Sequence, residues 1–276
     1  MTPLISANQL EEIINSGEDV LLCDCRFDLV DPLIGRKSYE ESHIPGAIHV
    51  DLDKDLSGPK NGINGRHPLP TPQAWAQTKT RLGISPTTLV VAYDKQGSVY
   101  ASRLWWMLKA TGHAKVQVLD GGLDAWNGPM GTIPRTPTPC TQAIGVMPYA
   151  GLVLVDEVVG NLQTQKNKIV DARADDRFHG QNETLDPVGG HIPGAMNRFF
   201  KNNLNATAFK TPEQLFKEFS ELLGPIKASE VIHQCGSGVT ACHNLLAMEL
   251  AGFKGSRLYA GSWSEWCADP QRPVEL

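Results

Sequence analysis

The stretch that decides the fold is VIHQCGSGVTAC, residues 231–242. A short apolar run leads into Cys235, a loop containing Gly236 and Gly238 follows, and a helix-forming segment begins near Ala241. Such a loop turns successive backbone N–H groups inward beside a helix N-terminus, and together these can bind an anion. We therefore expect Cys235 to be held as a thiolate, the form of sulfur that attacks electrophiles.

Length and composition indicate a globular protein with two domains. The chain has 276 residues, too many for one ordinary core. Its hydrophobic fraction of 41% excludes a disordered chain, and its net charge of −5 gives no reason to expect nucleic acid or a membrane surface as partner. No leader pattern or membrane-length apolar run is present, so we expect a cytoplasmic protein. The six cysteines form no CxxC pair, which favours free thiols.

The two halves of the sequence repeat one pattern. The paired motifs are DCR (24–26) with DAR (171–173), HIPGA (43–47) with HIPGA (191–195), and GGLDAW (121–126) with GSWSEW (261–266). One unit is therefore present twice. Because the HIPGA segment occurs in both copies and the reactive Cys in one, we interpret His43 and His191 as structural residues.

A segment rich in proline and glycine separates the two copies. Residues 128–139 read GPMGTIPRTPTP, which excludes regular structure and indicates an extended linker. We place an N-terminal domain at 1–130, the linker at 131–145 and a C-terminal domain at 146–276. Short apolar strands alternate with helical stretches in each copy, which predicts an α/β fold with parallel sheets flanked by helices. Ligands bind at the carboxyl ends of such strands, where Cys235 stands.

These motifs, in this order, resemble the tandem-domain rhodanese family of sulfurtransferases. The similarity covers essentially the whole chain, and the CGSGVT loop at 235–240 is most similar to that of the 3-mercaptopyruvate sulfurtransferases. The resemblance implies two rhodanese-like domains with the active site in the C-terminal copy. Aligning residues 90–97 with 231–238 puts Asp94 in the place of Cys235. A carboxylate is a poor carrier of sulfur, so we expect the N-terminal domain to be non-catalytic.

The resemblance also implies a double-displacement reaction that needs no cofactor or metal. Cys235 takes sulfur from the small-molecule donor 3-mercaptopyruvate, releases pyruvate and carries a persulfide to a thiol, thioredoxin-like or cyanide acceptor. Carried over from the family, Asp53 orients His67, and His67 polarises Ser237. Taken alone, Asp53 would be interpreted as a helix N-cap and His67 as a loop histidine. The residues predicted to bind the donor are Arg177, Gly236, Gly238, Val239, Thr240 and Tyr100.

One position departs from the family pattern. Arg177 suits a substrate carboxylate because its guanidinium can bind both oxygens. Similar mercaptopyruvate enzymes usually carry a second arginine nine residues later, where this chain has Asp186. Thiosulfate enzymes tolerate an acidic residue there but place basic side chains in the loop after the Cys, and this loop offers Gly236 and Ser237. We favour mercaptopyruvate because the loop touches the reacting sulfur, and we consider Arg198 as a replacement for the missing charge.

The sequence is also compatible with functions other than sulfur transfer from mercaptopyruvate. The alternatives kept open are a thiosulfate:cyanide sulfurtransferase and a non-catalytic persulfide carrier. A cysteine phosphatase is disfavoured because its Cys-x5-Arg motif needs an arginine where this chain has Ala241. A metal site formed by His233, Cys235, Cys242 and His243 is the weakest alternative, because these residues are split between a strand and a helix.

Overall fold

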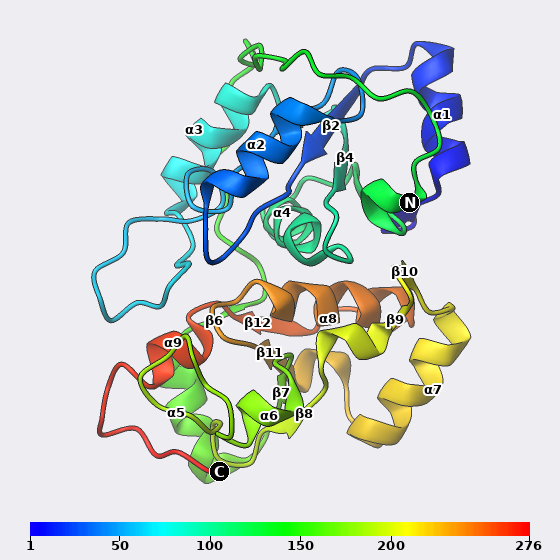
Figure 1. The fold of residues 1–276 in the computed structure, drawn as a ribbon. Coiled ribbons are helices and arrows are strands. Elements are labelled where there is room, and N and C mark those ends of the chain that lie inside the picture. Colours follow the sequence, from blue (N-terminus) through cyan, green and yellow to red (C-terminus); the bar gives the residue numbers. More distant parts are fainter. The chain divides into compact units, whose positions relative to one another are not determined.

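The computed structural model describes residues 1–276, and the two copies of the sequence pattern give two separate units (Figure 1). The first unit comprises Met1–Gly58, Pro70–Ala150 and Ala206–Ala208, and the second comprises Pro59–Leu69, Gly151–Asn205 and Phe209–Leu276. The segment Pro59–Leu69 therefore belongs to the second unit, although it lies in the N-terminal half of the sequence.

Strands and helices alternate in the first unit. Its strands are β1 (Leu4–Ile5), β2 (Val20–Asp24), β3 (Ile48–His49), β4 (Leu89–Tyr93) and β5 (Val116–Leu119). Its helices are α1 (Ala7–Ser16), α2 (Leu33–Glu41), α3 (Pro72–Leu82) and α4 (Val99–Ala110), with a 3-10 helix η1 (Gly122–Ala125). The strands form one parallel sheet in the order β1-β5-β4-β2-β3.

The second unit repeats this arrangement. Its sheet strands are β6 (Leu152–Val153), β7 (Lys168–Asp171), β8 (Met196–Asn197), β11 (Val231–Gln234) and β12 (Arg257–Tyr259). Two short strands lie outside the sheet, β9 (Leu204–Asn205) and β10 (Ala208–Phe209). The helices are α5 (Val155–Thr164), α6 (Asp175–Phe178), α7 (Pro212–Leu223), α8 (Thr240–Leu250) and α9 (Ser262–Trp266), with 3-10 helices η2 (Phe200–Asn203) and η3 (Ala228–Glu230).

Both sheets have the same topology. The second sheet is also parallel, and its order β6-β12-β11-β7-β8 matches the first sheet strand by strand. The central strands β4 and β11 are each followed by a loop and a helix. The predicted α/β fold, with a parallel sheet flanked by helices in each copy, is confirmed.

Helix starts follow from local sequence. Ser6 caps α1 by accepting a hydrogen bond from the Gln9 N–H at 3.3 Å, and the Gln9 side chain accepts one from the Ser6 N–H at 3.0 Å. Thr211 and Gln214 form the same capping box at α7, whose first residue is Pro212. Proline fits this position because the first N–H of a helix has no partner within the helix.

The repeated Asp-x-Arg motif forms the same buried brace in both units. Arg26 Nη2 lies 2.6 Å from Asp24 Oδ2, and Arg173 Nη2 lies 2.7 Å from Asp171 Oδ2. Each guanidinium also donates to the carbonyl oxygen of the residue just before the HIPGA segment. The motif therefore ties the end of a strand to the loop that leads to the edge strand. Bidentate pairs of this kind are both strong and specific in geometry.

The two HIPGA histidines are buried and bonded to the backbone. The ring Nδ1 of His43 lies 2.5 Å from the carbonyl oxygen of Tyr39, and that of His191 lies 3.0 Å from the carbonyl oxygen of Phe178. Because a carbonyl only accepts, each ring nitrogen donates there. These contacts support the interpretation of both histidines as structural.

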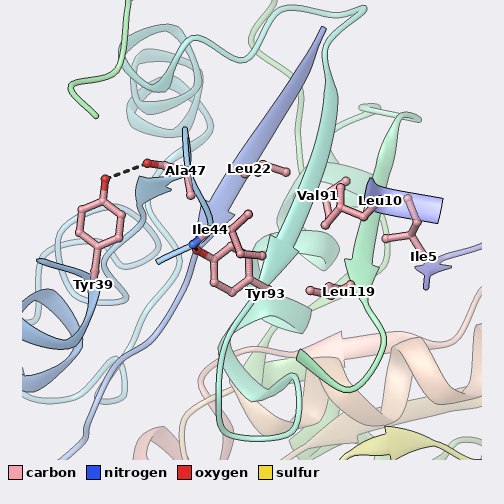
Figure 2. Packing of buried hydrophobic residues seen from close by; sticks show 9 residues of the cluster. All are labelled: Ile5, Leu10, Leu22, Tyr39, Ile44, Ala47, Val91, Tyr93 and Leu119. Atoms are coloured by element: carbon pink, nitrogen blue, oxygen red, sulfur yellow. Dashed lines mark hydrogen bonds between the residues drawn. The ribbon is translucent and has the colours of Figure 1, made fainter. Parts of the chain in front are cut away.

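A cluster of nine buried residues forms the core beside the first sheet (Figure 2). Its members are Ile5, Leu10, Leu22, Tyr39, Ile44, Ala47, Val91, Tyr93 and Leu119. The Tyr39 hydroxyl donates to the Ala47 carbonyl at 2.7 Å, and the Ile44 N–H donates to the Tyr93 hydroxyl at 3.2 Å. The tyrosines thus bury their rings in the core while their hydroxyls hold the loop before β3.

The residues expected to form a linker pack on the first unit. They contain neither helix nor strand, apart from the isolated bridge between Gly131 and His43. The Arg135 N–H donates to the Tyr39 hydroxyl at 2.9 Å. The first unit accordingly continues to Ala150. None of the helices has both the length and the apolar character needed to cross a membrane.

His233 on β11 makes the stability of the fold sensitive to acid. The residue is fully buried, which lowers its pKa to about 3, and the nearby Arg198 acts in the same direction. Below its ordinary pKa of about 6.5 the unfolded chain binds a proton at this histidine and the folded chain does not. The free energy of unfolding should therefore fall by up to about 1.4 kcal/mol per pH unit between the two pKa values.

The test is urea denaturation of the wild type and His233→Gln at neutral and at acidic pH. We expect a shallower decline for His233→Gln, whatever its stability at neutral pH, and an unchanged decline for the exposed control His179→Gln. Equal declines for wild type and His233→Gln would contradict the assignment.

Candidate functional site

Cys235 lies at the carboxyl end of the central strand β11 and is only 2% exposed. The start of α9 fixes its backbone on both sides. The Cys235 N–H donates to the Ser262 hydroxyl at 3.1 Å, and the Trp263 N–H donates to the Cys235 carbonyl at 2.9 Å. The Ser264 N–H donates to the Gly236 carbonyl at 2.9 Å. The GSWSEW motif thus serves to hold the cysteine loop.

The loop needs glycine at position 238. Gly238 has φ +75°, and a Cβ there would collide with the carbonyl oxygen of Ala260. After Val239 the chain enters α8 at Thr240, so the N-terminus of this helix adjoins the loop. Cys242 is fully buried one turn later, and its thiol donates to the Gly238 carbonyl at 3.3 Å.

The corresponding loop of the first unit surrounds the side chain of Asp94. Asp94 follows β4 and is fully buried. Its Oδ1 accepts from the N–H groups of Gln96 and Ser98 at 2.8 and 2.9 Å, and its Oδ2 accepts from those of Tyr100 and Ala101 at 2.8 and 3.0 Å. Burial raises the pKa of Asp94, while these four N–H groups oppose that shift by favouring the carboxylate. This type of loop can therefore surround a negative charge with backbone donors.

The structure brings Ser237 and His67 together. The Ser237 hydroxyl lies 2.7 Å from His67 Nδ1, and the two side chains are 6% and 5% exposed. His67 comes from the segment Pro59–Leu69, which belongs to the same unit as Cys235. A histidine in this position can take a proton from the serine or orient its hydroxyl.

Two predicted site residues belong to the first unit. Asp53 lies in the turn after β3, where its N–H donates to Asp51 Oδ1 at 2.9 Å. Tyr100 lies in the first turn of α4, and its ring makes an edge contact with Phe27 at 5.6 Å between centroids. The orienting role of Asp53 and the substrate contact of Tyr100 stay predictions.

Arg177 lies in a cluster of charged side chains beside the loop. Its Nη2 is 2.7 Å from Glu183 Oε2 and 3.5 Å from Asp186 Oδ2. Asp186 in turn forms an ion pair with Arg66, the residue before His67. Sequence reasoning missed Arg66 and Glu183. The only available signal for Arg66 was its position next to His67, which itself was found through the family resemblance.

The carboxyl groups of Asp186 and Glu183 have opposite pKa shifts. Burial raises the pKa of Asp186. The positive charges of Arg66 and Arg177 act to lower this pKa, but the negative charge of Glu183 partly cancels their effect. Burial also acts on Glu183, but the hydrogen bonds from Arg177 and from backbone N–H groups outweigh it and lower its pKa. Glu183 is therefore the firmer anchor of Arg177.

Arg198 is held away from this cluster. Its Nη2 lies 2.7 Å from Glu218 Oε2, its Nε donates to Asn203 Oδ1 at 2.9 Å, and its guanidinium stacks on Phe219 at 4.3 Å. The expectation that Arg198 supplies the missing charge at the loop is therefore wrong. Arg66, from a distant part of the sequence, lies there instead.

The side chains considered for a metal site have other contacts. His233 Nε2 lies 2.9 Å from the sulfur of Met248, and His243 stacks on Phe209 at 4.5 Å between centroids. No group of three His, Cys, Asp or Glu side chains is arranged to hold a metal ion.

Asp94→Ala should destabilise the first unit strongly. The change leaves four buried N–H groups without their acceptor, and one such loss costs about 1–3 kcal/mol. We expect the free energy of unfolding to fall by at least about 3 kcal/mol, even if water enters the loop. Chemical denaturation measures this, with the exposed Asp19→Ala as control. A loss as small as that of the control would contradict the role of Asp94.

Comparison with known proteins agrees with this geometry. The family described as rhodanese-like domain matches residues 6–129 and 154–269. A Pseudomonas aeruginosa protein named "Probable 3-mercaptopyruvate sulfurtransferase" is 45% identical over 279 residues, covering 98% of this chain and 97% of the relative. The thiosulfate sulfurtransferase of Rattus norvegicus is 35% identical over 95% of this chain and 91% of its own length.

A solved structure gives the same result. The 3-mercaptopyruvate sulfurtransferase from Leishmania major matches with a TM-score of 0.86 at 27% identity, over 99% of this chain and 75% of that one. The family resemblance inferred from the motifs is confirmed. The chain belongs to the rhodanese family and carries two rhodanese-like domains in tandem.

Proposed function

We propose that this protein is a sulfurtransferase that moves sulfur from 3-mercaptopyruvate, through a persulfide on Cys235, to a thiol, thioredoxin-like or cyanide acceptor. The observation that carries the proposal is the 2.7 Å contact between His67 and Ser237. Ser237 lies two residues after the reactive cysteine. Similarity to a Pseudomonas protein and a Leishmania enzyme that bear this activity in their names adds support.

In the first half-reaction the Cys235 thiolate attacks the sulfur of 3-mercaptopyruvate. A sulfur–sulfur bond forms, the carbon–sulfur bond breaks, and its electron pair leaves on carbon as the enolate of pyruvate. Protonation of that carbon gives pyruvate. Ser237, hydrogen-bonded to His67, polarises the departing group and supplies a route for the proton.

In the second half-reaction an acceptor thiolate or cyanide attacks the outer sulfur of the persulfide. The sulfur–sulfur bond breaks, and Cys235 leaves as a thiolate ready for the next donor. Backbone N–H groups from Gly236 to Thr240 stabilise the anion in both stages, as the loop around Asp94 illustrates for a carboxylate. Thiol acceptors of this kind belong to a reducing compartment, so the proposal places the protein in the cytoplasm.

Thiosulfate is the second candidate donor, because a rat thiosulfate sulfurtransferase is 35% identical to this chain. The proposal assigns catalysis to the C-terminal domain, since the first unit has Asp94 where the second has Cys235. A carrier that receives its persulfide from another protein would use the same cysteine without a donor of its own.

Cys235→Ser should abolish sulfur transfer and leave the fold intact, because a serine hydroxyl forms no persulfide. Incubation with 3-mercaptopyruvate followed by mass spectrometry should show one added sulfur on the wild type and none on the variant. Cys140→Ser, which changes a thiol in the first unit, is the matched control and should behave as wild type. Turnover by Cys235→Ser would end this mechanism.

Ser237→Ala should slow the use of mercaptopyruvate more than that of thiosulfate. Only mercaptopyruvate leaves as a carbanion that needs a proton, and loss of such assistance slows a reaction by about a hundredfold. The measurement is kcat/KM for both donors with cyanide as acceptor, with the exposed Ser229→Ala as control. Equal losses on both donors would exclude this role for Ser237, and turnover of neither donor by the wild type would favour the carrier.

A further inference from the structure

Two guanidinium groups lie over the residue that follows Cys235. A Cβ added to Gly236 would lie 2.8 Å from Arg66 Nη2 and 3.6 Å from Arg177 Nη2. Glycine at this position therefore lets Arg66 approach the backbone next to the reactive sulfur, while Arg177 lies at an ordinary contact distance. The loop has no basic side chain between Cys235 and Thr240, yet positive charge reaches it from two other segments.

The two arginines are held by two buried carboxylates. Asp186 pairs with Arg66, and Glu183 pairs with Arg177, while both carboxylate side chains are 3% exposed. The arginine side chains are more accessible, at 28% and 21% exposed. The acids thus lie behind the guanidinium groups, which keep part of their surface open.

We propose that Arg66 and Arg177 together bind the carboxylate of the sulfur donor, and that Asp186 is a positioning residue that holds Arg66 over Gly236. This inference rests on the proposed function, which supplies a donor with a carboxylate. Arg66 takes the place of the second arginine that the family pattern led us to expect at position 186. Asp186 is then part of the carboxylate site through its partner, and the conflict between the loop and position 186 disappears.

The charge of the cluster determines which donor it favours. Its members are Arg66, Arg173, Arg177, Asp171, Glu183 and Asp186. Three positive and three negative groups leave no formal excess charge. Such a cluster can offer directed hydrogen bonds to a monoanion such as mercaptopyruvate. It offers little net attraction to a dianion such as thiosulfate.

Pyruvate is the probe for the carboxylate site, because it carries the carboxylate without a transferable sulfur. Isothermal titration calorimetry should show that Arg66→Ala weakens pyruvate binding about ten- to a hundredfold, the loss expected for a charge-assisted hydrogen bond. Arg66→Lys keeps the charge without the planar fork and should lie in between. The exposed Arg36→Ala is the control and should bind as wild type.

Steady-state kinetics separate this site from the chemistry. Arg66→Ala should raise KM for mercaptopyruvate with a smaller change in kcat, since the residue binds the donor and does not move a proton. Pyruvate affinity equal in wild type and Arg66→Ala, or no pyruvate binding to the wild type, would overturn the inference. Failure of the proposed function would appear differently, as absence of a Cys235 persulfide after incubation with mercaptopyruvate.

Asp186→Asn tests the positioning role. The change leaves the cluster with one excess positive charge and releases Arg66 from its anchor. We expect kcat/KM for thiosulfate to rise about tenfold relative to that for mercaptopyruvate, because the dianion gains most from the extra charge. Asp186→Glu should retain the wild-type preference, as should the exposed control Asp175→Asn. An unchanged donor ratio in Asp186→Asn would remove Asp186 from the site.

Discussion

The backbone N–H groups of the loop after the central strand need an acceptor, and the first unit depends on meeting this requirement. The loop there points backbone N–H groups inward, and buried donors without an acceptor are costly. In the first unit the Asp94 carboxylate satisfies four of them permanently. In the second unit Cys235 occupies the same place. Under the proposed function a Cys235 thiolate takes that position and also reacts, so the same loop serves as a scaffold in one unit and as a reactive site in the other.

Much of the fold follows from the sequence because it depends on local and repeated signals. Apolar strands alternating with helices predict the parallel sheets, and the paired motifs predict the same topology twice. The contact between Ser237 and His67 could not be derived in this way, since 170 residues separate them. The family resemblance supplied that pair, and the geometry is consistent with it.

The charged cluster shows where residue-by-residue reasoning fails. Asp186 looked unfavourable because a carboxylate repels a carboxylate, but the effect of a buried charge depends on its partners. Its partner Arg66 lies 120 residues away in the sequence. Arg198, nearer in sequence, is bound to Glu218 instead. Ion pairs of this kind depend on which segments meet in the fold, and no local pattern encodes that.

The placement of Pro59–Leu69 with the second unit has a consequence for synthesis of the protein. The ribosome makes His67 long before Ser237, and the 170 residues from Pro68 to Ser237 take roughly ten to thirty seconds to add. During that time the segment lacks the part of the second unit to which it belongs, while most of the first unit has already been made. The contact between His67 and Ser237 therefore forms late, after translation of the second half.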